Sequence, residues 1–458
     1  MIAIGLLVIV AGVFTIILAF IPSVTQRIRD FMAGPPLFYG WYIVAVTMFI
    51  ALVTTGARNS FGIFIIPMEE EFGWSRFTLS IAVGTGFLVN GLTQPIAGHF
   101  FDKFDGKKVI LVGLVLMGLS TVLLSLTFNF LFLFFMFGFV VSIGLSGGSI
   151  TNTMSLLSRW FRRKRATTIA LSLAGSSLGG LLLIPLCQYL LEATNWRVTW
   201  VALGLLVLLL AVPLGYVFLR NHPSEKGLQP DGDTQDEAQA AATERRRGVL
   251  EVDQWSDSFR SAPMWQISAS YTVCGVTTGI IAAHFVPYAI DLGVSPGLAA
   301  TIFGVMMGLN VLGGLGAGIL SDRFGRKNVL AIVYFMRGIG YLLLLLMPSA
   351  TGLWIFATIA GFSWVASVPL TASLTADVYG LRALATISGI SFLCHQVGSF
   401  TSILLAGYLY DVTGSYTLPF ALAGSLLFPA AISAFTIKER KYSTRYQGVA
   451  VAAATAGD

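Results

Sequence analysis

The sequence has little charge for its length. Only 11% of its 458 residues are charged, whereas a soluble protein carries about 25%, and 55% of them are hydrophobic. Cysteines are also few: Cys187, Cys274 and Cys394 lie far apart, each within an apolar segment, so they do not form the framework of a disulfide-rich protein. The composition excludes a soluble globular protein and indicates a polytopic membrane protein.

Motifs of enzymes are missing too. The sequence contains no phosphate-binding loop of the form G-x-x-x-x-G-K-[ST] and no H-E-x-x-H zinc motif. Its longest polar stretch between apolar segments, residues 220–262, is too short to form a nucleotide-binding domain. We therefore expect no enzyme activity, no cofactor and no metal site.

Apolar segments long enough to cross a bilayer, about 20 residues each, are what the sequence has instead. Twelve of them can be placed, near 41–66, 77–101, 108–127, 129–157, 165–190, 197–219, 264–290, 298–320, 328–347, 352–376, 383–409 and 415–436. The predicted fold is an all-α membrane protein with 12 core transmembrane helices. The predicted parts are an N-terminal segment (1–37), a first bundle (38–219), a linker (220–262), a second bundle (263–437) and a tail (438–458).

The first 22 residues form an extra apolar segment. No Lys or Arg precedes it, and Arg27 and Arg29 follow it, which is the wrong flank for a signal peptide. Two interpretations stay open: a thirteenth helix, or a translation start at Met32 that would make residues 1–31 an artefact of the assigned start site.

Basic residues predict the orientation of the chain. If the first core helix starts inside, the cytoplasmic loops collect the great majority of the Lys and Arg residues, and the opposite face holds only Arg76 and Arg197. The net charge of +6 is thus a topology signal and does not indicate a nucleic acid partner. We expect a monomer in the lipid bilayer of the cell inner (plasma) membrane, with both ends of the core in the cytoplasm.

The two halves of the sequence repeat each other with an offset of 220 residues. The matching positions include Pro67 and Pro287, Glu71 and Asp291, Gly73 and Gly293, Ser75 and Ser295, Asn90 and Asn310, and Asp102 and Asp322. Two apolar segments could share glycines by chance, but hardly the proline, acid and amide together. We therefore expect two homologous six-helix bundles.

One repeated segment carries a family resemblance. GILSDRFGRK, which begins at Gly318, resembles the inter-helix signature of the major facilitator superfamily, and its first copy, GHFFDKFDGKK, begins at Gly98. The signature positions are Gly98, Asp102 and Lys103 in the first copy and Gly318, Asp322, Arg323, Gly325 and Arg326 in the second. Asp105 takes the usual glycine place in the first copy. The resemblance implies a latch that controls conformational exchange through close helix approach and pairing of the acid with basic groups.

Within that superfamily, YGWYIVAV (39–46), SFGIFIIPMEEEFGWSR (60–76) and HFVPYAIDLGVSP (284–296) resemble the monocarboxylate-transporter-like branch. This resemblance implies transport of small carboxylates by alternating access around a site near the midplane, with a proton or by exchange. Two positions depart from the branch: Asn59 lies where animal members have a lysine, and Asn310 and Gly314 replace an Asp and an Arg.

Only two basic residues lie deep in the core helices, Arg58 in the first and Arg337 in the ninth. An arginine at the bilayer centre costs about 2.5–3.5 kcal/mol, so it needs a partner. The carboxylates all lie near the helix ends, which leaves an anionic substrate as the partner of Arg58. The alternatives are that Arg58 snorkels or caps a neighbouring helix, and that Arg337, on a peripheral helix, is structural.

Other polar residues at mid-depth complete the predicted substrate site: Asn59, Asn90, Asn310 and His395. Asn90 and Asn310 could equally bond across helix contacts, and His395 is either a proton carrier or a structural histidine. We expect a secondary transporter for a small organic anion, a mono- or dicarboxylate, with proton coupling and exchange both open. Efflux of amphipathic compounds and a non-transporting membrane sensor are the alternatives.

Overall fold

The structure, a computed structural model, describes residues 38–161, 164–232, 250, 252, 254–380 and 384–443. These residues form helices and no strands. The N-terminal segment 1–37, residues 233–249 of the linker and residues 444–458 lie outside them, and so does the question of a thirteenth helix.

Six spans make up the N-terminal half. They are α2 (Gly40–Asn59) continued by η1 (Ser60–Phe64) and α3 (Ile65–Phe72); α4 (Arg76–Lys103); α5 (Gly106–Leu123) with η2 (Leu124–Leu126); α6 (Phe130–Leu133), η3 (Phe134–Val141), α7 (Ser142–Gly147) and α8 (Ile150–Trp160); α9 (Arg165–Ala193); and α10 (Trp196–Leu206), η4 (Val207–Ala211) and α11 (Val212–Phe218).

Six more spans make up the C-terminal half. They are α13 (Ala262–Asp291); α14 (Pro296–Phe324); α15 (Arg326–Leu346); α16 (Ala350–Ser363) with α17 (Ser367–Tyr379); α18 (Leu384–Thr413); and α19 (Thr417–Ser425) with α20 (Leu427–Thr436). Short helical turns η5 (Pro223–Lys226), η6 (Pro230–Gly232) and η7 (Trp255–Arg260) lie between the halves, and α21 (Glu439–Tyr442) follows the last span.

The predicted membrane fold is confirmed. Within the described ranges, 11 helices are long and apolar enough to cross a membrane. The twelfth, α4, has the length but carries Asn90, Thr93 and Gln94 in its apolar run. Each predicted span overlaps one observed span, with ends that differ by a few residues.

Local sequence explains why the helices end where they do. Gly73 and Gly293, which are repeat mates, end the first helix of each half with φ of 66° and 81°, a backbone conformation that side chains with a Cβ rarely adopt. Ser75 then caps α4 by accepting a hydrogen bond from the Thr78 backbone N–H at 3.2 Å. The first turns of the two halves thus share the glycine but not the cap, because Ser295 makes no side-chain cap bond and Pro296 begins α14.

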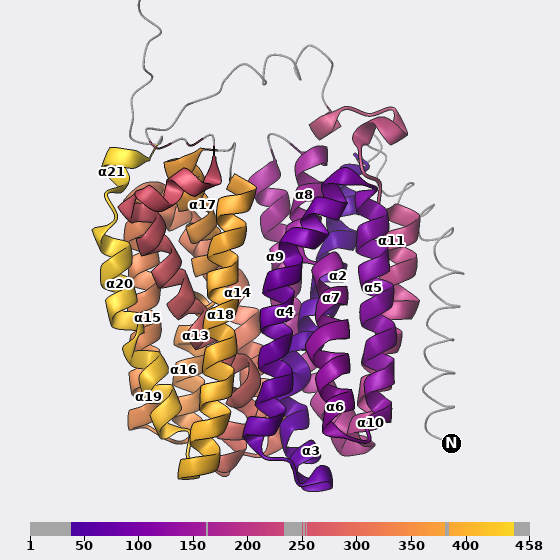
Figure 1. The fold of residues 1–458 in the computed structure, drawn as a ribbon, viewed down its shortest axis with the longest axis vertical. Helices are drawn as coiled ribbons and strands as arrows, with labels where there is room; N and C mark the ends of the chain where they lie inside the picture. Colours follow the sequence, from indigo (N-terminus) through magenta and orange to yellow (C-terminus); the bar gives the residue numbers. More distant parts are fainter. Residues whose placement is uncertain are drawn as a thin grey trace, which may run out of the picture.

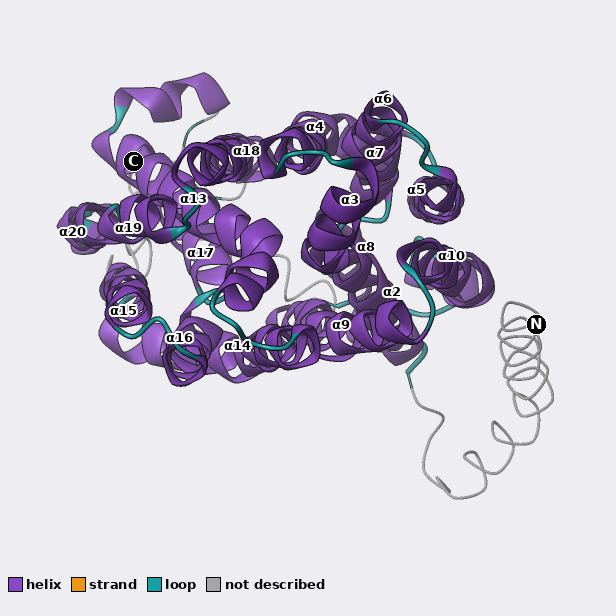
Figure 2. Ribbon diagram, turned by 90° about the horizontal axis from the view of Figure 1, so that it is seen from below, coloured by secondary structure: helices purple, strands orange, loops and turns teal. Residues whose placement is uncertain are grey.

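The two bundles lie side by side and contact each other along two helix pairs, α4 with α18 and α9 with α14 (Figures 1 and 2). Contacts between the halves run from the level of Asn59 and Asn90 toward the end where α3, α10 and α19 are found. There, a Cβ on Gly84 would strike Leu404, and a Cβ on Gly304 would lie 2.9 Å from Pro185.

At the opposite end, which carries the linker, the same helix faces separate. Leu92, Ile96 and Phe100 on this part of α4 are exposed, and so are Leu312, Leu315 and Ile319 on α14. Added Cβ atoms on Gly98 and Gly318 would meet nothing within 4 Å. The structure is thus closed at one end of the interface and open at the other.

Candidate functional site

Arg58 lies near the middle of the span Gly40–Phe72, at the level where the halves begin to part. Its guanidinium stacks 3.7 Å above the centroid of the Phe87 ring. Its buried Nη2 atom has no hydrogen-bond partner among the residues described, and no carboxylate of those residues forms an ion pair with it. The Arg58 guanidinium thus packs on the Phe87 ring and keeps N–H groups that donate to no described residue.

Arg337 of α15 has a different environment. It is 1% exposed, and its Nη2 donates to the Ser363 carbonyl and, at 2.8 Å, to the Trp364 carbonyl. These carbonyls end α16 just before the chain turns into α17. Its Nη1 approaches Thr277 Oγ1 of α13 at 3.3 Å. The guanidinium thereby supplies hydrogen-bond donors to carbonyls that are left free where α16 ends in the interior. These contacts favour the structural alternative for Arg337.

A polar network crosses between the halves beside Arg58. Gln396 of α18 donates through Nε2 to the Phe87 carbonyl at 3.2 Å and to Asn90 Oδ1 at 3.0 Å. Asn90 in turn donates to Ser146 Oγ at 2.8 Å. Gln396 therefore binds the backbone of the residue whose ring stacks on the Arg58 guanidinium.

His395 joins the network from the other side. Its Nδ1 lies 3.2 Å from Gln396 Oε1, and its Nε2 lies 3.2 Å from Thr278 Oγ1 of α13. The imidazole also packs on Tyr271, with ring centroids 4.8 Å apart. The structure thus connects His395 with Asn90 through one glutamine.

The two other predicted residues have separate partners. Asn59 donates to Met307 Sδ at 3.5 Å, another contact between the halves. Asn310 accepts from the Val365 backbone N–H at 3.0 Å and donates to the Met306 carbonyl at 3.2 Å, so it secures the break between α16 and α17. The structure therefore gathers Arg58, Asn90 and His395 around Gln396 and Phe87, and it places Arg337 and Asn310 at the helix break.

The signature loops lie at the open end, beside the linker. In the second copy, Gly325 has φ of 91° and leads into α15, and Arg326 pairs with Asp377 at 2.8 Å. Two backbone N–H groups, of Arg326 and Lys327, donate to the Glu439 carboxylate at 3.0 Å. Arg323 is exposed and Asp322 has an interaction partner. This copy is tied to its own half in the present conformation.

In the first copy, Asp105 replaces the turn glycine and caps α5 itself by accepting from the Lys108 backbone N–H at 3.3 Å. Asn221 Nδ2 also donates to Asp105 at 2.6 Å. Burial raises the pKa of this carboxyl, but the bonds from Asn221 and Lys108 outweigh it and leave the pKa below its usual value. The Nζ atom of Lys103 lies 5.7 Å from the centroid of the Phe104 ring. The side chain of Asp102 is not among those that the structure describes.

The predicted site omits Gln396, Thr278 and Tyr271. Gln396 is visible in the sequence as a mid-depth polar residue beside His395. Thr278 carries a subtler signal, because it lies 220 residues after Arg58 and is therefore its repeat mate. Tyr271 has no such signal, since a tyrosine in an apolar helix is ordinary.

Comparison with known proteins agrees with this architecture. The family model of the Major Facilitator Superfamily matches residues 47–403 and 281–453. An uncharacterized MFS-type transporter of Bacillus subtilis, YcxA, is 30% identical over 390 residues, which are 82% of this chain and 90% of that protein. Rat monocarboxylate transporter 12 is 24% identical over 90% of this chain and 88% of its own length, and rat monocarboxylate transporter 13 is 26% identical over 85% and 86%.

Among solved structures, a bacterial homologue of the human lysosomal transporter Spinster has the same fold, with a TM-score of 0.68, 15% identity, and coverage of 91% of this chain and 100% of that one. The relatives are named transporters and not enzymes. The chain therefore belongs to the major facilitator superfamily of membrane transporters, in the branch that includes the monocarboxylate transporters.

Proposed function

We propose that this protein is a secondary transporter that moves a small organic anion, a mono- or dicarboxylate, across the cytoplasmic membrane by alternating access. One observation carries the proposal: Arg58 lies at mid-depth with a buried N–H group that no described residue accepts from. Because an unpaired guanidinium in this position is costly, a substrate carboxylate that forks onto it would offset the cost and be oriented by it.

The surroundings of Arg58 suit an anion that arrives from the open end. The cation lies where the halves diverge, on the ring of Phe87, whose backbone carbonyl accepts from Gln396. Arg337, in contrast, has its terminal nitrogens engaged with Ser363, Trp364 and Thr277. Arg58 is therefore the principal anchor in this proposal, and Asn90 and His395 line the same region.

The conformation fits one state of the transport cycle. The basic loops predict that the open end faces the cytoplasm, so the structure represents an inward-facing state. Gly98 and Gly318, where an added Cβ would meet nothing within 4 Å, lie on the parts of α4 and α14 that would approach the opposite half when this end closes. Asp102, Asp322 and the neighbouring basic residues would then act as the latch. Proton symport through His395 or the substrate's own carboxyl, and anion exchange, are the two coupling modes considered.

The test begins with uptake of a carboxylate panel into vesicles, which identifies a transported anion. Binding of that anion is then measured for Arg58→Lys and Arg58→Gln. We expect the dissociation constant of Arg58→Gln to be 10- to 100-fold larger, because hydrogen bonds to a charged group contribute about 1.5–3 kcal/mol each. Arg58→Lys should lose less affinity, because lysine keeps the positive charge but cannot form two parallel hydrogen bonds to a carboxylate.

The matched control is Arg260→Gln, which removes one positive charge from the exposed linker. It should leave binding unchanged. Unchanged affinity in both Arg58 variants, in protein that still folds, would contradict the proposal. Neither the positive charge nor the paired hydrogen bonds of the guanidinium would then contribute to binding.

A further inference from the structure

The closed end of the interface is held by a cluster that the central site does not include. Arg76, at the start of α4, is 5% exposed, and its Nη1 and Nη2 bind Asp291 of the opposite half at 2.5 and 2.9 Å. Glu69 accepts from its Nε at 3.1 Å, and its guanidinium lies 3.9 Å from the Tyr410 ring. This cluster, here called the outer lock, joins α4 to α13 and α18.

His284 lies directly behind the outer lock and is fully buried. Its Nε2 is 3.1 Å from the Ile403 carbonyl and 3.3 Å from Ser80 Oγ, and its Nδ1 is 3.0 Å from the Tyr416 hydroxyl. A carbonyl can only accept, so the proton is on Nε2, and Nδ1 then accepts from Tyr416. Ser80 fits this tautomer, because its own proton goes to the Arg76 carbonyl at 2.6 Å.

The closed cluster disfavours a second proton on this imidazole. Protonation would put a donor on Nδ1 facing the Tyr416 hydroxyl, which would have to turn its own proton away from the histidine and accept instead. It would also bury a second cation close to Arg76, which lies 5.5 Å from the ring of the same tyrosine. The closed outer end therefore holds His284 neutral.

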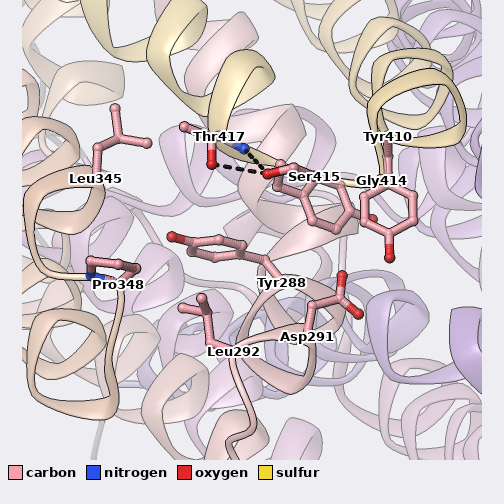
Figure 3. Close-up of a pocket in the computed structure, with 10 residues that line it drawn as sticks. Tyr288, Asp291, Leu292, Leu345, Pro348, Tyr410, Gly414, Ser415 and Thr417 are labelled. Carbon is pink, nitrogen blue, oxygen red and sulfur yellow. Dashed lines mark hydrogen bonds between the residues drawn. The ribbon is translucent and has the colours of Figure 1, made fainter.

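Opening of the outer end would change this environment, because Ser80 and Arg76 belong to α4 and leave with the N-terminal half. A cavity of about 170 Å³ already reaches the lock from the outer face; it is lined by Asp291, Tyr410 and Tyr416 among others (Figure 3). Figure 3 shows the Asp291 carboxylate and the Tyr410 hydroxyl turned toward one another. Solvent would then reach the imidazole from this side.

We propose that His284 is a proton-binding site of the outer gate, neutral while the gate is closed and protonated from the outer solution once α4 has moved away. A protonated His284 opposes closure, so acid outside holds the gate open. This site lies apart from Arg58 and His395, and the proposal holds whichever anion is carried.

The charged and titratable groups that face His284 determine the pH range of the test. They are Arg76 on α4, Glu69 on α3, Asp291 and Tyr288 on α13, Asp411 and Tyr410 on α18, and Tyr416 before α19. Carboxylates titrate near pH 4 and tyrosines near pH 10, whereas imidazole titrates at about 6.5. A change between about pH 8 and pH 5.5 therefore reports a histidine, and the His284→Gln variant shows whether it is this one.

The test measures the distance between the halves with spin labels at Glu70 and Val412, two exposed residues at the outer end that lie outside the lock. The labels are placed in protein whose three native cysteines are replaced. With wild-type His284, the outer-open population should rise at least threefold as the pH falls from about 8 to about 5.5. In His284→Gln, which keeps a donor and an acceptor but does not titrate, it should not change.

Two further variants keep the test decisive. His395→Gln should retain the full pH response, and Tyr416→Phe, which keeps the ring but removes the donor to Nδ1, should shift the response to higher pH. A response that survives in His284→Gln, disappears in His395→Gln, is unmoved in Tyr416→Phe, or is absent from the wild type overturns the proposal.

Discussion

The two halves of this transporter share their helix scaffold but differ where they meet the central site. Asn90 and Asn310 are repeat mates, and each reaches the break in a later helix of its own half, through Ser146 and Val365 respectively. Lys107 and Lys327 are also mates, and each donates to a carbonyl of the last helix of its half, at 2.6 and 2.8 Å. Repeated residues therefore maintain the bundle.

Two residues of the candidate site differ from their repeat mates. Arg58 in the first half corresponds to Thr278 in the second, and His395 corresponds to Gly175. Gly175 lets α9 lie directly on α2, where a Cβ would clash with the Met48 carbonyl. In the second half Gly275 of α13 lies against the backbone of His395. His395 therefore occupies in the second half the position that a glycine holds in the first.

The two buried arginines offer the largest expected effect. Arg337→Gln should destabilise the protein by about 2–5 kcal/mol, because the Ser363 and Trp364 carbonyls lose their donor in the interior. Arg58→Gln should not lower stability, because it removes a guanidinium with an unpaired N–H. Thermal unfolding in detergent compares the two variants with the wild type. Equal losses of stability in both would remove the distinction between a structural and a functional arginine.

The latch offers an intermediate effect. Asp322→Asn should slow transport roughly tenfold, the size of a coupling of about 1–2 kcal/mol, while equilibrium binding of the substrate changes by no more than a few-fold. The reason is position: Asp322 lies at the open end, next to the loop that leads into α15, and far along α14 from the residues around Arg58. Uptake rates and binding isotherms on the same preparation separate the two quantities. A defect confined to binding would contradict the assignment of the latch.

The sequence predicts the twelve spans and the unpartnered Arg58, because hydropathy and the location of every carboxylate are local properties that can be read along the chain. It does not predict the bonds of Arg337. Those bonds depend on where α16 breaks, and although Pro369 lies in the first turn of α17, it does not mark Ser363 and Trp364 as the residues whose carbonyls are left free. Arg76 is equally hidden: as a loop residue it counts only toward charge bias, yet packing of α4 against α13 and α18 buries it in the outer lock.

The smallest expected effect concerns the difference between His395 and its mate, Gly175. If transport is coupled to protons, the proton is carried by His395 or by the substrate, because the Asp and Glu residues lie toward the helix ends. A symporter needs a group whose protonation changes between its two states, and imidazole titrates near neutral pH, at about 6.5. The side chain is suitably connected, since Gln396 joins it to Asn90 of the opposite half and Thr278 holds its other nitrogen.

The measurement is uptake into vesicles after a pH jump, with the outer solution made acidic, for the wild type and His395→Gln. We expect the wild type to accumulate the anion. Accumulation in the variant should be a few-fold lower, while its anion exchange at constant pH continues. Gln396→Ala is the companion variant, because it removes the link to Asn90 but leaves the imidazole in place, and it should weaken coupling less. Full proton-driven accumulation in His395→Gln would make the histidine structural, and a wild type without proton dependence would identify an exchanger or uniporter. In either case the functional asymmetry between the halves would rest on Arg58 alone.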